Sequence, residues 1–340
     1  MQEYVMGNGA IALGALAAGV NLVAGYPGTP SSEILETISK YRHDGVYIEW
    51  SVNEKAAMEV AAAAAYSGAR AMVTMKQVGL NVAADPLMSL AYVGVKGGMV
   101  IVSADDPGPI SSQTEQDTRR FADFCRIPVF DPSSPEEAYK MIGEAFEYSE
   151  KYNTPVLFRP TTRVCHAYAS IDNCDSPSPK KYEGFVKDSK KWVIFPRLSF
   201  ANHIMIEKRN VEIGKDFSTY SANKAEGGNS EKAVVTSGIS YAYTKECLKD
   251  YPDVKLIKIA TAYPFPEDFV LSSLEGAKEV LCIEELSPFI EEQILKLAGK
   301  HGLQLKVSGK LDGKVQAGGE NSTDKIAAIL GEFLGTDFTA

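Results

Sequence analysis

Short runs of β-forming residues alternate with alanine- and leucine-rich helical segments throughout the first part of this chain. The six candidate strands lie at residues 21–25, 46–49, 71–75, 99–103, 127–130 and 156–158. Segments such as 9–18 and 54–67 lie between them and have the spacing of helices. Strands that alternate with helices form βαβ units. We therefore expect an α/β domain over residues 1–165, with a mostly parallel sheet covered by helices on both faces.

The rest of the chain divides into a connecting segment and a second α/β domain. Residues 166–231 contain two polar, turn-rich stretches, and we expect this segment to be largely irregular. A helix over 198–211 is compatible with the spacing of its residues. From residue 232 to residue 340 the alternation resumes, which predicts a smaller domain. Its candidate strands are 233–238, 254–259 and 279–285, and its candidate helices are 240–248, 288–300 and 324–333.

Charge and cysteine usage exclude several classes of protein. The net charge of -9 argues against nucleic acid as a partner, because binding phosphates needs clustered Lys and Arg. The five cysteines include no CxxC pair, which predicts reduced thiols and no ferredoxin-type cluster on this chain. No apolar run approaches the roughly 20 residues that span a bilayer, and the N-terminus lacks the basic region of a signal peptide. We therefore expect a cytoplasmic protein.

Several common catalytic motifs are absent from the sequence. It contains no GxSxG elbow, no Walker A loop and no HExxH. Its four histidines have no metal-like spacing, so we expect no metal ligands on this chain. A hydrolase of the Ser-His-Asp or Cys-His type therefore has no support.

An acidic residue, Glu54, begins the alanine-rich helix expected after the second strand. Ser51 and Glu54 have the spacing of a capping box, and an acid in the first turn complements the helix dipole, so this reading needs no ligand. The functional reading is that Glu54 is a buried carboxyl group facing a cofactor. The alanines that follow would let a ring approach the helix closely. Both readings stay open on the residues alone.

A second motif, Gly25-Tyr-Pro-Gly-Thr-Pro-Ser-Ser-Glu33, lies where the first strand ends and a helix begins. Ligands of open α/β sheets bind in the crevice at such carboxyl ends of strands. Thr29 can be the N-cap with Pro30 as the first helical residue, which would satisfy backbone amides only. Alternatively, the Thr29 hydroxyl and nearby amides contact an anionic substrate group. The two roles are compatible.

Two further polar segments, 74–81 and 105–120, also follow strands. In the first, Gly79 would let the backbone come close to a ligand. The second carries more hydrogen-bonding side chains than a turn requires, although an ordinary well-capped loop also explains them. Because all four segments follow successive strands, they can converge at one edge of the sheet. That joint placement is stronger evidence than any single motif.

Together these segments resemble the alpha subunit of indolepyruvate ferredoxin oxidoreductase, in the wider pyruvate:ferredoxin oxidoreductase superfamily. The matching motifs are residues 25–33, 49–55, 75–81, 84–98, 104–109, 111–119 and 159–163. The second domain resembles the C-terminal domain of transketolase at 261–266 and 284–288. The resemblance implies a thiamine-enzyme pyrimidine-binding-type domain with a parallel sheet, followed by a transketolase C-terminal-like α/β domain.

By this resemblance, Glu54 is the catalytic acid that activates the aminopyrimidine of thiamine diphosphate, and Thr29 faces the substrate. Gly28, Gln113 and Arg119 are further candidates for substrate binding. Gln77, Gly79 and Asn81 join Glu54 as candidate cofactor contacts. The family decarboxylates a 2-oxoacid on thiamine diphosphate, passes electrons through iron-sulfur clusters to ferredoxin, and transfers the acyl group to coenzyme A. Aryl pyruvates are the substrates of the indolepyruvate branch.

The sequence departs from the full-length family pattern. It has no Gly-Asp-Gly followed by an Asn to hold magnesium and diphosphate, and no cluster cysteines. We expect magnesium and the 4Fe-4S clusters on a partner chain or domain, so that the thiamine site is shared. The beta subunit, ferredoxin and a second copy of this chain are further expected partners. A natural split subunit and a fragment are equally compatible with the sequence. A non-catalytic scaffold of the same fold and a transketolase-type component remain alternatives.

Overall fold

The computed structural model of the chain describes residues 2–42, 44–173 and 178–336. Its first domain is built on a six-stranded parallel sheet in the order β3-β2-β4-β5-β7-β6. The strands are β2 (Leu22–Gly25), β3 (Tyr47–Trp50), β4 (Ala71–Lys76), β5 (Met99–Ala104), β6 (Val129–Phe130) and β7 (Val156–Phe158). The six predicted strands are confirmed, with small shifts at their ends.

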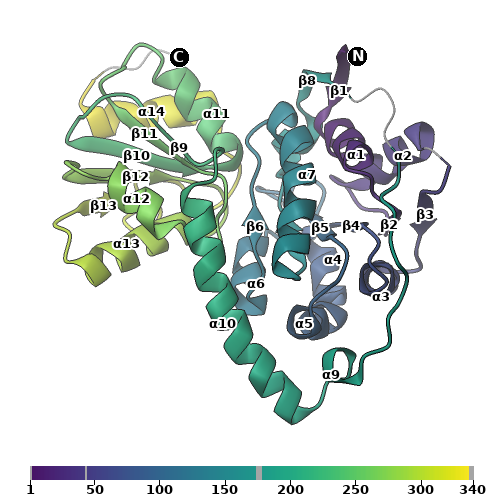
Figure 1. Ribbon diagram of the computed structural model, residues 1–340. Coiled ribbons are helices and arrows are strands. Elements are labelled where there is room, and N and C mark those ends of the chain that lie inside the picture. Colours follow the sequence, from purple (N-terminus) through teal and green to yellow (C-terminus); the bar gives the residue numbers. More distant parts are fainter. Residues whose placement is uncertain (1, 43, 174–177, 337–340) are drawn as a thin grey trace.

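Helices cover both faces of this sheet (Figure 1). One face carries α1 (Gly7–Ala17), α2 (Ser32–Tyr41) and α7 (Pro135–Tyr152), and the other carries α3 (Glu54–Tyr66), α4 (Gln77–Val82), α5 (Ala84–Val93) and α6 (Thr118–Cys125). Successive side chains of a strand point to opposite faces. Accordingly Met72 packs in the cluster with α1 and α7, whereas Val73 packs in the cluster with α3 and α5. Both faces of the sheet are therefore buried.

The start of α7 is fixed by hydrogen bonds to the loop before it. Ser134 is the N-cap, its side chain accepts a hydrogen bond from the backbone N–H of Glu137 at 3.3 Å, and Pro135 is in the first turn. The Glu137 carboxylate, however, accepts from the backbone N–H of Ser133 at 2.7 Å rather than from the N-cap residue itself. The N-terminus of α7 is thus capped by Ser134 and also joined to Ser133 through the Glu137 carboxylate.

The N-terminal segment pairs with a distant segment, and neither strand was predicted. Strand β1 (Gln2–Met6) runs antiparallel to β8 (Tyr168–Asp172), with Gln2 opposite Asp172, and the short helix α8 (Thr162–His166) precedes β8. The two strands form a separate two-stranded sheet beside α1 and α7 (Figure 1).

The connecting segment is more ordered than expected. It contains α9 (Ser189–Trp192), α10 (Pro196–Ser218) and β9 (Lys224–Glu226). Helix α10 contains the proposed helix 198–211 and extends it at both ends. It lies beside α5 and runs from the far end of the first domain toward the second domain (Figure 1). None of the helices in the described ranges is long and apolar enough to cross a bilayer.

The second domain contains a five-stranded sheet in the order β13-β12-β10-β11-β9. Strands β10 (Lys232–Ser237), β11 (Lys255–Ile259), β12 (Glu279–Ile283) and β13 (Lys306–Ser308) are parallel, and β9 is antiparallel at the edge. Helices α12 (Glu267–Ser273) and α13 (Phe289–His301) pack on one face, and α11 (Gly238–Cys247) and α14 (Thr323–Leu334) pack on the other. The three predicted strands and three predicted helices of this domain are confirmed, while β9, β13 and α12 were not predicted.

The two domains meet where the carboxyl ends of β10, β11 and β12 face the first domain. The backbone N–H of Val129 donates to the carbonyl oxygen of Tyr263 at 2.7 Å, and that of Asp131 donates to Ala260 at 2.8 Å. One apolar cluster continues across this junction from the α3 face of the first sheet to the α13 face of the second. The domains are therefore joined by both backbone hydrogen bonds and a shared core.

Candidate functional site

The four polar segments that follow β2, β3, β4 and β5 meet at one edge of the first sheet. These strands are neighbours in the sheet, so their carboxyl ends lie side by side. The Ser111 hydroxyl donates to the carbonyl oxygen of Thr29 at 3.3 Å, and Lys76 Nζ donates to Oε1 of Gln113 at 3.0 Å. The predicted convergence of the four loops is therefore observed, and the region where they meet, beside the start of α3, is the expected ligand-binding crevice of an open α/β sheet.

Glu54 is the first residue of α3 and is only 7% exposed. The N-cap is Asn53, whose Oδ1 accepts a hydrogen bond from the backbone N–H of Ala56 at 2.9 Å. The capping box predicted for Ser51 and Glu54 is therefore wrong, and the Ser51 hydroxyl instead donates to Oε1 of Glu49 at 2.6 Å. Because Asn53 caps the helix, the Glu54 carboxylate is not needed for that purpose.

The Glu54 carboxylate lies against Gly79 in the first turn of α4. A Cβ added at Gly79 would lie 2.5 Å from Oε1 of Glu54, which is closer than van der Waals contact allows. Within the described residues, no hydrogen bond or ion pair involves this carboxylate. Buried carboxylates almost always have hydrogen-bond donors. The arrangement therefore leaves an acceptor at the crevice that is available to a ligand.

Thr29 is exposed beside this crevice, but it does not cap a helix. Helix α2 begins at Ser32 with Ser31 as N-cap, so the predicted N-cap role of Thr29 is wrong. The reason is local: Ser31 and Gly28 form a turn in which the Ser31 hydroxyl donates to the carbonyl oxygen of Gly28 at 2.9 Å. The Thr29 hydroxyl makes no hydrogen bond to any described residue, so it can contact a ligand.

Lys76 belongs to the crevice, although it was not among the predicted site residues. It ends β4, and a Cβ at Gly28 would lie 3.1 Å from its Cγ and Cδ. Its ammonium group contacts the neutral amide of Gln113, and no carboxylate among the described residues pairs with it. The signal was available, since a lysine at the carboxyl end of a strand lies at the ligand-binding edge of an α/β sheet. Lys76 gives the crevice a positive charge without a counter-ion.

The structure places the amides of Gln77 and Asn81 against the loop after β5. Gln77 is fully buried, and its Nε2 donates to the carbonyl oxygen of Thr114 at 3.1 Å. Asn81 Nδ2 donates to Oε1 of Gln116 at 3.0 Å. Both side chains therefore fix the position of the segment that carries Gln113.

Arg119 lies away from the crevice surface, in the interface between the two domains. It is fully buried, and its guanidinium pairs with Asp117 at 2.7 Å and with Glu284 of the second domain at 2.8 Å. It also donates to the carbonyl oxygens of Glu285 and Ser287 at 2.9 and 3.1 Å. The residue predicted to bind substrate thus joins the loop after β5 to the end of β12.

A second buried arginine anchors the other end of this loop. Arg159 Nε donates to Asp105 at 2.7 Å, and its Nη1 donates to Asp131 at 3.2 Å. Burial raises the pKa of Asp105 to about 6 in spite of Arg159. For Asp117, burial acts in the same direction, but the adjacent Arg119 outweighs it and lowers the pKa to about 2. The loop between Asp105 and Asp117 is therefore held at both ends by buried ion pairs.

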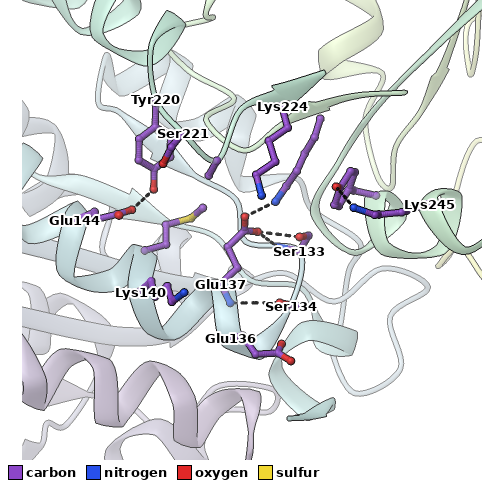
Figure 2. Close-up of a pocket in the computed structure, with 14 residues that line it drawn as sticks. Ser133, Ser134, Glu136, Glu137, Lys140, Glu144, Tyr220, Ser221, Lys224 and Lys245 are labelled. Carbon is purple, nitrogen blue, oxygen red and sulfur yellow. Dashed lines mark hydrogen bonds and ion pairs between the residues drawn. The ribbon is translucent and has the colours of Figure 1, made fainter. Parts of the chain in front are cut away.

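A separate polar cavity of about 410 Å³ lies between the start of α7 and the second domain (Figure 2). In it Glu137 pairs with Lys258 of β11, and Glu144 accepts a hydrogen bond from Tyr220. Lys245 pairs with a glutamate of β9 at 2.8 Å. Its buried charges are paired within the chain, and none of the four loops lines it. We assign this cavity to the domain interface.

Across the described parts of the chain, no three His, Cys, Asp or Glu side chains form a group that could hold a metal ion.

Comparison with protein families and sequences gives a consistent match. Residues 13–220 match the family described as pyruvate flavodoxin/ferredoxin oxidoreductase, thiamine-diphosphate-binding. The chain is 41% identical to "indolepyruvate oxidoreductase subunit IorA" of Thermococcus kodakarensis, over 98% of this chain and 53% of that protein. It is 40% identical to the protein of the same name from Methanothermobacter thermautotrophicus, over 98% of this chain and 54% of that protein. The chain therefore spans about half the length of these relatives.

Comparison with solved structures shows the fold. A 2-oxoglutarate:ferredoxin oxidoreductase from Magnetococcus marinus matches with a TM-score of 0.76 at 16% identity, over 97% of this chain and 65% of that one. A split-gene transketolase, described as an inactive beta4 tetramer, matches with a TM-score of 0.62 at 13% identity, over 97% of both chains. These likenesses confirm the predicted fold, a pyrimidine-binding-type domain followed by a transketolase C-terminal-like domain.

Proposed function

Because the chain belongs to the thiamine-diphosphate-binding family of pyruvate flavodoxin/ferredoxin oxidoreductases, we propose that it forms the aminopyrimidine side of a thiamine diphosphate site. The enzyme would be a 2-oxoacid:ferredoxin oxidoreductase of the indolepyruvate type, and this chain alone would be inactive. The observation that carries the proposal is the largely buried Glu54 side chain, whose carboxylate lies against Gly79 and has no partner among the described residues, at the crevice where four loops meet.

The residues at this crevice fit the aminopyrimidine of the cofactor. When bound, thiamine diphosphate supplies a carbanion that attacks a 2-oxo carbon and an acceptor for the electrons released by decarboxylation. Glu54 would share a proton with the outer ring nitrogen of the aminopyrimidine, which favours the imino form. Gly79 leaves the carboxylate room to face the ring, because any side chain at that position would displace it. The role of Glu54 is therefore to hold one proton at its carboxylate.

The same crevice has groups suited to the carboxylate of a 2-oxoacid. Among the described residues, Lys76 provides a cation that pairs with no carboxylate, and the Thr29 hydroxyl makes no hydrogen bond and is free to donate. Gln113 holds the Lys76 ammonium group at 3.0 Å and so positions it. Gly28 allows the lysine side chain to pass close to the backbone. We assign substrate binding to Thr29, Lys76 and Gln113, and we assign Gln77, Asn81 and Arg119 to positioning of the loop.

The rest of the catalyst would lie on other chains or domains. The relatives named indolepyruvate oxidoreductase subunits are about twice as long as the matched region, so their additional residues are candidates for the diphosphate, magnesium and 4Fe-4S sites. An aryl pyruvate would be the 2-oxoacid, coenzyme A the acyl acceptor and ferredoxin the electron acceptor. The beta subunit and a second copy of this chain are the further partners that we propose, in the cytoplasm.

Replacement of Glu54 by Gln tests the proposal in the enzyme assembled with its partner chains. Oxidation of indolepyruvate with coenzyme A and a viologen dye should fall at least a hundredfold, because general acid-base groups contribute about 10²–10⁴ in rate. Glu59→Gln, on the exposed side of the same helix, should leave the rate unchanged. Both variants should unfold at the denaturant concentration of the wild type. A Glu54→Gln enzyme with near-normal turnover would remove Glu54 from its proposed role.

A further inference from the structure

A second cavity, of about 590 Å³, lies between helix α10 and the C-terminal ends of α5 and α7. Helix α10 contributes residues 198, 201, 202, 205, 206, 209 and 212, which share one helix face by their spacing. The apolar part of the wall includes Leu198, Met205, Ile206 and Tyr92. A volume of this size, with an apolar wall beside polar and charged side chains, is typical of sites for small organic molecules.

Arg209 lines this cavity and has no hydrogen-bond or ion-pair partner among the described residues. Its Nε and Nη2 atoms are buried without a hydrogen-bond acceptor, and no hydrogen bond or ion pair joins the guanidinium to any described residue. Burial lowers the pKa of Arg209 to about 10. A buried charge without a partner is strongly unfavourable, and arginine is suited to binding carboxylates with two parallel hydrogen bonds. An anion in the cavity would supply the missing acceptor.

None of the other charged side chains around the cavity forms an ion pair with Arg209 among the described residues. Glu212 is paired with Lys215 at 2.9 Å, and Lys151 is paired with Asp216. Lys190 and Lys191 of α9 also line the cavity, and neither ammonium group pairs with a carboxylate of the described residues. Burial, followed by repulsion from Lys96, lowers the pKa of Lys191. The cavity therefore combines an apolar wall with an excess of unpaired positive charge.

This cavity is distinct from the crevice at Glu54. Helix α5 ends at Val93 and α7 ends at Tyr152, shortly before β5 and β7 begin. The cavity is therefore beside the amino ends of the strands, whereas Glu54, Thr29 and Lys76 lie at their carboxyl ends. A ligand here would not contact the proposed thiamine site.

We propose that this cavity binds a small organic acid, with its carboxylate on Arg209 and its apolar body against α10. The apolar body can be an aryl ring or an alkyl chain, since the wall offers both aromatic and aliphatic side chains. Lys190 and Lys191 add long-range attraction for the anion. The site goes beyond the proposed function and does not depend on it.

Calorimetric titration of the intact chain with indole-3-propionate and with octanoate tests this site. One or both acids should bind. Binding of indole-3-propionate would indicate that the cavity takes an aryl group, and binding of octanoate would indicate that it takes an alkyl chain. Binding should weaken about tenfold or more in Arg209→Met and for the neutral amide of the same acid, because a charge-assisted hydrogen bond is lost. Arg197→Met, an exposed arginine of the same helix, should bind like the wild type.

Two further measurements separate this site from the alternatives. Lys76→Met should leave the affinity unchanged, since an acid bound at the thiamine crevice would contact Lys76 and respond to that variant. Without ligand, Arg209→Met should be at least as resistant to urea as the wild type, because the variant removes an unpaired buried charge. Absence of binding by both acids, or equal affinity in Arg209→Met, would overturn the proposal.

Discussion

Glu54 and Gly79 are in such close contact that only a hydrogen fits on the α-carbon of residue 79. A Cβ there would lie 2.5 Å from Oε1, 2.7 Å from Cγ and 2.8 Å from Cδ of Glu54. A Gly79→Ala substitution must therefore rotate the Glu54 carboxylate away from its position. The glycine belongs to a helix of only six residues, so the room that it leaves for the Glu54 carboxylate is more important here than its effect on helix stability.

We expect Gly79→Ala to reduce turnover of the assembled enzyme by at least tenfold, because small displacements of a reacting group reduce rates severely. The free energy of unfolding should change by no more than about 1 kcal/mol, since the displaced atoms end a flexible side chain and alanine favours the helix. Gly299→Ala in α13, where a Cβ meets nothing within 4 Å, is the matched control and should keep full activity. Unchanged turnover in Gly79→Ala would contradict the placement of Glu54.

Lys76 should determine affinity for the 2-oxoacid more than the rate of its conversion. Lys76→Met removes the unpaired cation of the crevice and keeps most of the side-chain volume. The KM for indolepyruvate should rise about tenfold or more, since hydrogen bonds to charged groups contribute roughly 1.5–3 kcal/mol. Lys55→Met removes a surface ion pair with Asp85 and should leave KM unchanged. Steady-state kinetics at several substrate concentrations would measure both, and an unaltered KM in Lys76→Met would exclude this role.

The sequence was informative about the parallel sheet because its strands are short apolar runs between helices, as at Val73 and Ile101. It did not reveal β1 and β8, whose alternate residues are exposed and whose partners are far apart in sequence, with Gln2 opposite Asp172. Helix α10 extends beyond its predicted ends because much of it is solvent-exposed, with Phe200 exposed at 69%, and because Asn202 and Asn210 are buried among its apolar residues, which obscures the pattern in the sequence.

Only those parts of the site that lie within local sequence motifs could be predicted. The stretch around Glu54 identified the acid, but the cap depends on Asn53, two residues from the Ser51 that the motif favoured. Arg119 is an extreme case, because its partner Glu284 lies 165 residues later and comes from the other domain. Local sequence could identify a conspicuous arginine in a polar loop, but only the tertiary structure places a buried carboxylate beside it.

The Arg119 network predicts a large difference between two neighbouring arginines. Arg119 and Arg120 both lie over the ring of Phe289, at 5.4 and 5.2 Å, so their cation–π contacts are matched. Arg119→Met would leave Asp117 and Glu284 buried without their cation, at a cost of about 3–5 kcal/mol. Arg120→Met removes a half-exposed pair with Glu292 and should cost less than about 1 kcal/mol. Urea denaturation of both variants measures the difference, and equal losses would contradict the interface assignment.

Glu285, at the end of β12, gives the domain interface a dependence on pH. Burial raises its pKa from the usual 4.5 to about 7, and the hydrogen bond from the Asn321 backbone N–H offsets only part of this effect. The protonated acid is therefore favoured in the folded state. Its contribution to stability is complete below pH 4.5, where the unfolded chain is also protonated, and is lost as the pH rises through about 7.

Glu285→Gln should therefore become more stable relative to the wild type as the pH rises from 5 to 8. Glutamine keeps a side-chain oxygen that can accept from Asn321 but has no proton to lose. Since one pKa unit corresponds to about 1.4 kcal/mol, the gain should approach about 3 kcal/mol at pH 8. The free energy of unfolding in urea, measured at each pH for both proteins, gives this difference directly. Glu36→Gln, an exposed acid on α2, should show no such trend. A pH-independent difference between Glu285→Gln and the wild type would mean that Glu285 is ionised in the folded protein throughout this range.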